Sequence, residues 1–327
     1  MANIAITSEC NLHCRYCFTQ GEYKTGARNH GHMPLNIFQS ALDFVMRSNI
    51  GQVRILGGEP TLHPQIIHFL EMAQQTGRPI RLFSNGLMPE AVLEYLSALP
   101  EDIITVILNI THWTDELPEA KSGLEKTLSA LNRNVMPGLN IYHKSARLNF
   151  LLNLIRDFNL KKQVRLGLAH PCIDYKNTCL LPKHYSLIGQ RIADFARVAR
   201  SESVKINLDC GFVPCMFNGE HLSELGLDPK PGTHCEPIPD ILPDGSIVAC
   251  YPLGRLINLP LTATLTADAV RAHFQKTLSK FQAVGIFKWC ALCDYKRTGA
   301  CTGGCTAQKL MRFSSSQRIT IAESPWS

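Results

Sequence analysis

The chain has 327 residues, of which 45% are hydrophobic and 18% charged, and its formal net charge is +6. A disordered chain would be poorer in apolar residues and richer in charge, so this composition predicts a folded protein with a full core. We find no secretory signal and no apolar stretch near the ~18 residues of a membrane helix. We therefore expect a cytoplasmic protein, in which 13 cysteines indicate metal or redox chemistry rather than disulfides.

Predicted strands and helices alternate along the first 209 residues. The strands are expected at 3–7, 53–56, 80–84, 103–109, 139–142, 164–169 and 204–208. The helices are expected at 35–48, 65–76, 89–99, 121–132, 145–158 and 185–200. This alternation is typical of a parallel sheet, and six β/α units favour an α/β fold, a partial (β/α)6 TIM-like barrel. The active site of such a barrel lies at the carboxyl ends of its strands.

The cysteines divide the chain into segments. Three lie between residues 10 and 17, and the next two, Cys172 and Cys179, follow only after a long gap. The other eight lie between residues 210 and 305. We therefore predict a core barrel over 1–209, a small Cys-rich domain over 210–313 and a loose polar tail over 314–327.

The first cysteines, Cys10, Cys14 and Cys17, place three thiols on a short loop after the first strand. Three thiolates can hold three corners of a [4Fe–4S] cluster and leave one iron open, which is the property of a chemical rather than a closed structural site. A zinc knuckle with His13 as fourth ligand is the alternative, although zinc sites usually use paired, separated ligand groups.

This loop resembles the signature of radical S-adenosylmethionine (SAM) enzymes, including the aromatic Tyr16 before the third cysteine. The segment Gly57-Gly58-Glu59-Pro60 resembles the GGEP segment that ends the second strand in that family. The resemblance implies that the three cysteines ligate a [4Fe–4S] cluster whose open iron binds SAM. Reductive cleavage of SAM would then give a 5′-deoxyadenosyl radical that abstracts a substrate hydrogen.

The same resemblance implies a set of SAM contacts. Gly57, Gly58 and Glu59 would hold the SAM amino group, because glycines allow close backbone approach and a carboxylate accepts from an ammonium. Tyr16 would lie near the adenine. Ser84 and Asn109 stand where the family contacts the SAM carboxylate and ribose, and ordinary strand-end hydrogen bonding is their alternative role.

Eight later cysteines form a second constellation: Cys210, Cys215, Cys235, Cys250, Cys290, Cys293, Cys301 and Cys305. Their spacing resembles the auxiliary-cluster domain of SPASM and twitch radical SAM enzymes, although one spacing is longer and the usual last cysteine is missing. Asp244-Gly245 predicts a hairpin that brings Cys235 and Cys250 together. One auxiliary cluster with spare thiols, or a zinc ribbon, remains an alternative to two clusters.

The family pattern implies how these eight thiols would divide. Cys235, Cys250 and Cys305 would share one [4Fe–4S] cluster, with Cys215 as the candidate fourth ligand. The other cluster would be held by Cys290, Cys293 and Cys301, with Cys210 or a non-cysteine group completing it.

Three residues are candidates for chemistry specific to this chain. Cys172 and Cys179 lie after the sixth predicted strand, where a thiol could return a hydrogen atom to a substrate radical; idle thiols are the alternative. Tyr251 stands where sulfatase-maturing relatives carry an Asp, so formylglycine formation is disfavoured; a substrate-side or redox tyrosine and a packing tyrosine are its alternative roles. Residues Thr111, His112 and Trp113 could line a substrate cleft or anchor an exposed loop.

Taken together, the motifs predict a radical SAM enzyme that modifies a peptide. The alternatives are a small-molecule radical enzyme, favoured by a single auxiliary cluster, and a non-catalytic iron–sulfur electron-transfer protein. The resemblance implies an electron donor such as flavodoxin or ferredoxin. We expect a peptide's leader to be recognised by the barrel or by a separate leader-peptide-binding protein. No membrane partner is expected, and the modest charge disfavours nucleic acid.

Overall fold

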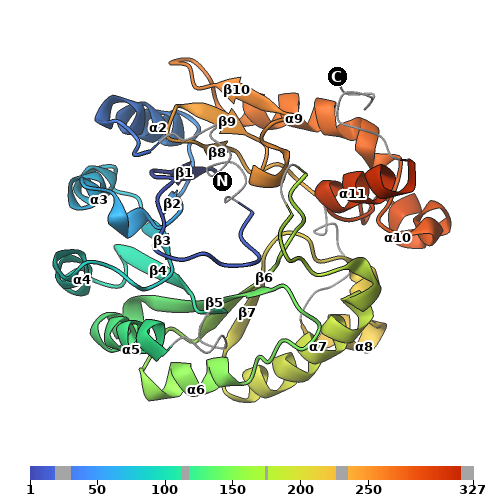
Figure 1. The fold of residues 1–327 in the computed structure, drawn as a ribbon, viewed down its shortest axis with the longest axis horizontal. Helices are drawn as coiled ribbons and strands as arrows, with labels where there is room; N and C mark the ends of the chain where they lie inside the picture. The colour runs from blue at the N-terminus through green and yellow to red at the C-terminus, as the bar shows by residue number, and fades with distance from the viewer. Residues whose placement is uncertain (19–30, 112–117, 174–175, 226–234, 318–327) are drawn as a thin grey trace.

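The computed structural model describes residues 1–18, 31–111, 118–173, 176–225 and 235–317. Strands β1 to β7 curve around the centre of the molecule, and helices α2 to α7 cover their outer side (Figure 1). Helices α9, α10 and α11 lie beyond the open side of this arrangement. The α/β fold class, a partial TIM-like barrel followed by a Cys-rich segment, is therefore confirmed.

The elements have the following bounds. The strands are β1 (Asn3–Ala5), β2 (Val53–Leu56), β3 (Ile80–Ser84), β4 (Ile104–Asn109), β5 (Val135–Ile141), β6 (Gln163–Leu168), β7 (Lys205–Leu208), β8 (Asp240–Ile241), β9 (Ser246–Val248) and β10 (Asn258–Pro260). The α-helices are α2 (Leu35–Arg47), α3 (Ile66–Gln75), α4 (Glu90–Ser97), α5 (Pro118–Leu131), α6 (Phe150–Asp157), α7 (Tyr185–Ser201), α8 (Gly219–Glu224), α9 (Ala267–Gln282), α10 (Asp294–Arg297) and α11 (Thr306–Gln317). Short 3₁₀ turns are η1 (Pro60–Leu62), η3 (Asn132–Asn134), η4 (Pro182–His184), η5 (Pro214–Met216), η6 (Tyr251–Leu253) and η7 (Lys288–Leu292).

The ten strands of the described residues belong to one sheet with the order β10-β9-β8-β1-β2-β3-β4-β5-β6-β7. Neighbours from β8 through β1 to β7 are parallel, whereas β8, β9 and β10 pair antiparallel. The turn at Asp244-Gly245 joins β8 to β9 as the sequence predicts. The segment after residue 210 thus extends the barrel sheet beside β1, and a domain boundary at 210 stays a prediction.

Most predicted elements differ from the structure by a few residues at their ends, and three differences are instructive. Strand β5 begins at Val135 rather than 139, because Pro137-Gly138 lies within the strand instead of preceding it. Helix α6 begins at Phe150 rather than 145; His143 and Ser145 form a local turn, in which the Ser145 hydroxyl lies 2.6 Å from the His143 Nδ1. The predicted loose tail is helical as far as Gln317, and residues 318–327 lie outside the described part.

Two apolar clusters lie on opposite faces of the sheet. The large one fills the space between the strands and the outer helices, with Phe38 and Phe69 stacked at 4.0 Å. The small one, on the inner face, comprises Ala5, Leu242, Val248 and Tyr251, with Phe18 and Leu56 packed against it. No helix in the described ranges combines the length and the apolar character required to cross a bilayer.

Candidate functional site

The three N-terminal cysteines gather on the loop that leaves the carboxyl end of β1. The Cys17 amide donates to the Cys14 carbonyl at 3.0 Å, and the Leu12 amide donates to the Cys10 Sγ at 3.4 Å. Burial, reinforced by the Glu59 carboxylate and the other two thiols, raises the pKa of Cys10 to about 11. The loop therefore brings three sulfur donors together, as a cluster with one open iron requires.

Gly57 and Gly58 lie directly against this loop. The Gly58 amide donates to the Thr7 carbonyl at 2.8 Å, and the Glu59 amide donates to the Glu9 carbonyl at 2.6 Å. A Cβ on Gly57 would lie 2.6 Å from the Thr7 carbonyl oxygen, and one on Gly58 would lie 2.2 Å from that of Glu9. The glycines are thus required by the cysteine loop's own backbone, whereas the sequence interpretation explained them by approach to a ligand.

The Glu59 carboxylate is fully buried and already has four protein donors. Oε1 accepts from the Thr61 amide at 3.2 Å, the Thr61 hydroxyl at 2.7 Å and the Ser84 hydroxyl at 2.8 Å, and Oε2 accepts from the Asn85 amide at 2.7 Å. Burial outweighs these hydrogen bonds and raises the pKa of Glu59. Glu59 and Ser84 therefore join the ends of β2 and β3, and their contact with SAM stays a prediction. Pro60 begins the 3₁₀ turn η1 and is buried.

Two asparagines that sequence reasoning missed hold the cysteine loop on the end of β3. The Asn85 Nδ2 donates to the Asn11 Oδ1 at 2.8 Å, and the Asn11 Nδ2 donates to the Leu87 carbonyl at 2.7 Å. The Leu87 amide completes the bridge by donating to the Asn85 Oδ1 at 2.9 Å. The only sequence signal was Asn85-Gly86, which indicated a strand end and nothing more.

Tyr16 points into the barrel, where it is 6% exposed. The Asn109 Nδ2 donates to its hydroxyl at 2.8 Å, and the Tyr142 ring stacks on it with centroids 5.2 Å apart. Burial raises the pKa of Tyr16, so its hydroxyl is protonated. The structure thus joins Tyr16 and Asn109 by a direct hydrogen bond, and their contact with SAM stays a prediction.

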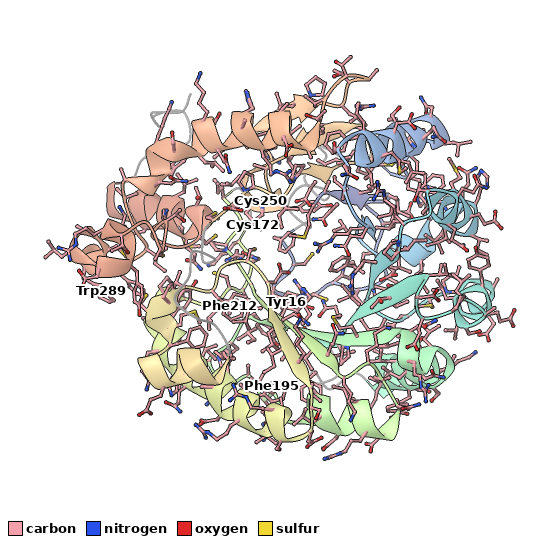
Figure 2. All side chains as sticks on the ribbon, turned by 180° about the vertical axis from the view of Figure 1, so that it is seen from behind. Tyr16, Cys172, Phe195, Phe212, Cys250 and Trp289 are labelled. Atoms are coloured by element: carbon pink, nitrogen blue, oxygen red, sulfur yellow. The ribbon has the colours of Figure 1, made fainter. Side chains whose placement is uncertain are left out.

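The eight later cysteines fall into two four-cysteine sets. The first set comprises Cys210, Cys235, Cys250 and Cys305, and burial together with the neighbouring thiols raises the pKa of Cys250 in it. In the second set, burial and three neighbouring thiols raise the pKa of Cys215 to about 12, and the members are Cys215, Cys290, Cys293 and Cys301. Figure 2 shows Cys250 near the centre of the molecule and Trp289, which borders the second set, at its outer edge.

The structure corrects the expected partners of Cys210 and Cys215. The sequence interpretation placed Cys215 with the first set and Cys210 with the second, and the structure reverses them. Cys210 lies two residues after the end of β7, whereas Cys215 lies in the 3₁₀ turn η5. There the second set borders a small pocket that is also lined by Trp289 and Lys296.

Two buried side chains beside the sets support the presence of a bound group. The neighbouring Cys305 and Cys210 sulfurs outweigh burial and raise the pKa of His170, whose Nε2 lies 3.7 Å from the Cys210 Sγ. Tyr185 is 2% exposed and lies within electrostatic reach of both Cys305 and Cys215. Its hydroxyl has no hydrogen-bond partner in the described part of the chain. An unsatisfied buried hydroxyl next to two thiol sets is consistent with a cluster that supplies the acceptor.

The chemistry of the donors fits iron–sulfur clusters, because cysteine thiolates are the ligands of [4Fe–4S] clusters. Within the described ranges, no group of three or more His, Cys, Asp or Glu side chains is placed to hold one metal ion. The residues present therefore fit a cluster at the triplet and at each four-cysteine set.

The three remaining candidates lie between the triplet and the first set. The Cys172 Sγ donates to the Phe18 carbonyl at 3.3 Å, next to Cys17. Cys179 lies near His170 and Cys305, and burial raises its pKa. The Tyr251 ring packs 5.5 Å from that of Phe18 and is 5% exposed. Catalytic roles for the three stay predictions, and His112 and Trp113 lie outside the described residues.

Comparison with known proteins decides the family. Residues 4–145, which contain the cysteine triplet and the Gly57–Pro60 segment, match the radical SAM superfamily. Residues 4–145 form a radical SAM domain. Membership of this superfamily implies that the chain uses a [4Fe–4S] cluster and SAM, and the triplet is the site whose donors fit that cluster.

Relatives of this radical SAM enzyme include proteins that act on nucleotides. It is 22% identical over 269 residues to an S-adenosylmethionine-dependent nucleotide dehydratase of Selenomonas ruminantium, covering 78% of this chain and 85% of that protein. It is 27% identical over 172 residues to a probable GTP 3′,8-cyclase of Pyrococcus abyssi. That match covers 46% of this chain and 55% of the cyclase, so the chain spans about half the cyclase's length.

Solved structures share its fold. The structure of anSMEcpe with bound AdoMet aligns with a TM-score of 0.67 and 18% identity, over 97% of this chain and 96% of that chain. Streptococcus suis SuiB bound to S-adenosylmethionine aligns with a TM-score of 0.63 and 15% identity, over 95% of this chain and 73% of that chain. SuiB bound to its precursor peptide SuiA aligns with a TM-score of 0.59 and 16% identity, covering 83% of this chain and 64% of that chain.

Proposed function

We propose that this radical SAM enzyme carries two auxiliary [4Fe–4S] clusters and modifies a side chain or the backbone of a peptide. The observation that carries the proposal is the division of eight cysteines into two complete sets of four. Cys10, Cys14 and Cys17 would hold the SAM-binding cluster, which supplies the hydrogen-abstracting 5′-deoxyadenosyl radical when loaded. The two four-cysteine sets would hold the auxiliary clusters and handle single electrons.

The inner face of the barrel supports a substrate that is apolar on one side and polar on the other. The small apolar cluster around Ala5, Val248 and Tyr251 occupies the side formed by β1, β2, β8 and β9. Polar side chains occupy the other side: Asn109 ends β4, and Arg165 is on β6. A peptide offers both an apolar side chain and amide groups. The folds of anSMEcpe and of SuiB, which was solved with a precursor peptide, agree with this proposal.

A small-molecule substrate is the second candidate, and the sequence relatives favour it. The nucleotide dehydratase matches most of this chain, and the GTP cyclases match much of the barrel. Two complete auxiliary sets support the peptide, because a single auxiliary cluster would favour the small-molecule enzyme. An electron donor of the flavodoxin or ferredoxin type and a separate leader-peptide-binding protein complete the proposal.

The test begins with anaerobic reconstitution and iron counting. We expect about twelve irons per chain, and Cys14→Ala should lose about four of them together with the EPR change on SAM addition. Release of 5′-deoxyadenosine from SAM in the presence of dithionite is then measured with each candidate substrate. The candidates are the peptides encoded beside this gene, GTP and CTP. Stimulation by a peptide, with a mass change in it, supports the proposal. Stimulation by a nucleotide alone would establish the second candidate, and no 5′-deoxyadenosine under any condition would refute radical chemistry.

A further inference from the structure

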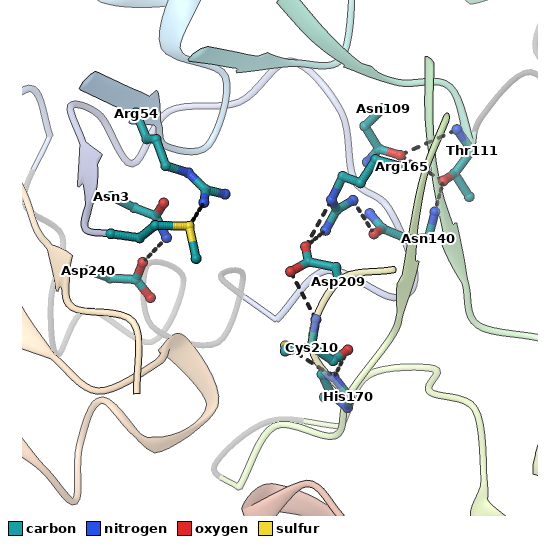
Figure 3. A network of polar contacts seen from close by, with 11 residues as sticks. Asn3, Arg54, Asn109, Thr111, Asn140, Arg165, His170, Asp209, Cys210 and Asp240 are labelled. Atoms are coloured by element: carbon teal, nitrogen blue, oxygen red, sulfur yellow. Dashed lines mark hydrogen bonds and ion pairs between the residues drawn. The ribbon is translucent and has the colours of Figure 1, made fainter. Parts of the chain in front are cut away.

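A chain of polar contacts runs across the barrel from Tyr16 to Cys210, and Figure 3 shows the part of it from Asn109 to Cys210. It begins at Tyr16, whose hydroxyl accepts from the Asn109 Nδ2 at 2.8 Å. The Thr111 hydroxyl donates to the Asn109 Oδ1 at 2.7 Å and accepts from the Asn140 amide at 2.9 Å. The contacts thus pass from the loop to β4 and on to β5.

The second half of this chain of contacts is an ion pair between Arg165 and Asp209, followed by a hydrogen bond to the backbone of Cys210. The Arg165 guanidinium donates to the Asn140 Oδ1 at 3.0 Å and, through Nε, to the Asp209 Oδ2 at 2.9 Å. Its second terminal nitrogen also contacts that carboxylate oxygen, so Asp209 is held by two donors. The other Asp209 oxygen accepts from the Cys210 amide at 2.9 Å. Arg165 therefore fixes the carboxylate that fixes the backbone of Cys210.

Glycines on β5 and β6 leave space in the barrel for the Arg165 guanidinium. Gly138 on β5 pairs with both Asn109 on β4 and Arg165 on β6, so the three residues lie at one level of the barrel. A Cβ on Gly167 would lie 2.9 Å from a terminal nitrogen of Arg165 and 2.8 Å from the Asn140 Oδ1. The contact between Arg165 and Asn140 therefore requires a glycine at position 167.

The position of Cys210 makes such an anchor necessary. Cys210 follows β7, the last strand at one edge of the sheet, and its residue is exposed. Two other members of the first set, Cys235 and Cys250, flank the β8–β9 hairpin on the far side of β1. Strand β7 does not pair with β8, so the first set joins two parts of the sheet that no backbone ladder connects.

We propose that Arg165 and Asp209 are positioning residues that hold Cys210 in the first four-cysteine set and tie that set to Asn109 and Tyr16 at the SAM site. The inference rests on the proposed function, since it requires a cluster in that set. Partners that orient ligands in this way typically change metal affinity 10- to 100-fold when they are removed.

The test measures the release of iron to a chelator from the reconstituted enzyme. Cys210→Ala and Cys215→Ala first assign one pool of iron to each four-cysteine set. Asp209→Ala should then speed iron release from the Cys210 pool by about 10- to 100-fold and leave the Cys215 pool unchanged. Asp209→Asn, which keeps an acceptor for the Cys210 amide but loses the ion pair, should fall between Asp209→Ala and the wild type.

The control is Glu202→Gln, which breaks an ion pair of similar geometry, 3.0 Å from Arg156, outside the chain of contacts. It should leave every pool unchanged. Amide hydrogen exchange on the loaded enzyme adds a second measurement: Asp209→Ala should raise exchange in β7 and at Tyr16, and Glu202→Gln should not. Equal acceleration of all iron pools would show a merely structural role and overturn the inference.

Different experimental results would refute this inference and the proposed function. A wild-type chain with only about four irons refutes the auxiliary clusters and the inference with them. Retention of the auxiliary iron with no effect of Asp209→Ala refutes the positioning role alone. If one auxiliary pool is found, the two cysteine variants identify its set, and a pool that survives Cys210→Ala also overturns the inference.

Discussion

Replacing Gly58 by alanine should disrupt the SAM-binding cluster without touching any of its ligands. The added Cβ would lie 2.2 Å from the Glu9 carbonyl oxygen, 2.7 Å from the Glu9 carbonyl carbon and 2.8 Å from the Ser8 carbonyl oxygen. All three are backbone atoms, so no side-chain rotation relieves the overlap. The Glu9 carbonyl must move by roughly 1 Å to reach ordinary contact, and Glu9 directly precedes the first ligand, Cys10.

Two effects set the expected loss of folding stability in Gly58→Ala. Overpacking against a fixed neighbour destabilises a protein by about 1–3 kcal/mol. Displacing the Glu9 carbonyl also weakens the 2.6 Å hydrogen bond that it accepts from Glu59, which adds about 1 kcal/mol. We therefore expect Gly58→Ala to lower the free energy of unfolding by about 2–4 kcal/mol and to reduce the iron bound by the triplet.

The assay compares Gly58→Ala with Gly51→Ala, because a Cβ on Gly51 would meet nothing within 4 Å. Thermal midpoint, iron per chain and the SAM-dependent EPR change are measured for both anaerobic proteins. Gly51→Ala should stay within about 0.5 kcal/mol of the wild type. If the two variants behave alike, the close packing of Gly58 on the cysteine loop does not matter and the reasoning is wrong.

Three further predictions concern other buried groups. Burial raises the pKa of Asp240, which accepts from Asn3 at 2.5 Å, to about 7, so the folded chain holds this proton more tightly than the unfolded chain. The stabilisation that the protonated Asp240 provides is lost as pH rises toward 7, by about 1.4 kcal/mol per pH unit. The thermal midpoint of Asp240→Asn should therefore lack this dependence on pH. If the Tyr185 hydroxyl, which has no partner among the described residues, donates to a bound cluster, Tyr185→Phe should make one auxiliary reduction potential more negative, whereas Tyr95→Phe should not. Cys172→Ala should keep the wild-type iron content, because this thiol belongs to none of the cysteine sets.

Much of the fold could be predicted because the signals are local. Strands β2 and β3 match their predicted bounds, since β-branched or apolar runs end at Gly57-Gly58 and Asn85-Gly86. The start of β5 was missed because Pro137-Gly138 normally interrupts a strand. Tertiary pairing overrides that preference: Pro137 pairs with Leu108 on β4 in the middle of the sheet.

The candidate site could be predicted only in part, for a different physical reason. The grouping of eleven cysteines as candidate ligands could be predicted, because thiols at short spacing are rare without a metal, and their ligation stays a prediction. Which set Cys210 and Cys215 enter could not, because spacing along the chain does not say which way the turn at η5 directs each thiol. The Arg165–Asp209 pair left no signal at all, since its members come from different strands and meet only inside the barrel.

The open edge of the sheet would let the proposed auxiliary cluster lie close to the SAM site. A closed barrel would pair β7 with β8, but here β8 pairs with β1 on the far side. The gap leaves room for cysteines from both edges, so an auxiliary cluster can face the same interior as the SAM site. Cys172, bonded to Phe18 beside the triplet, and Cys179, close to His170 and Cys305, lie on the loop between these sites. A substrate bound in this interior would therefore meet the hydrogen-abstracting site on one side and an electron acceptor on the other.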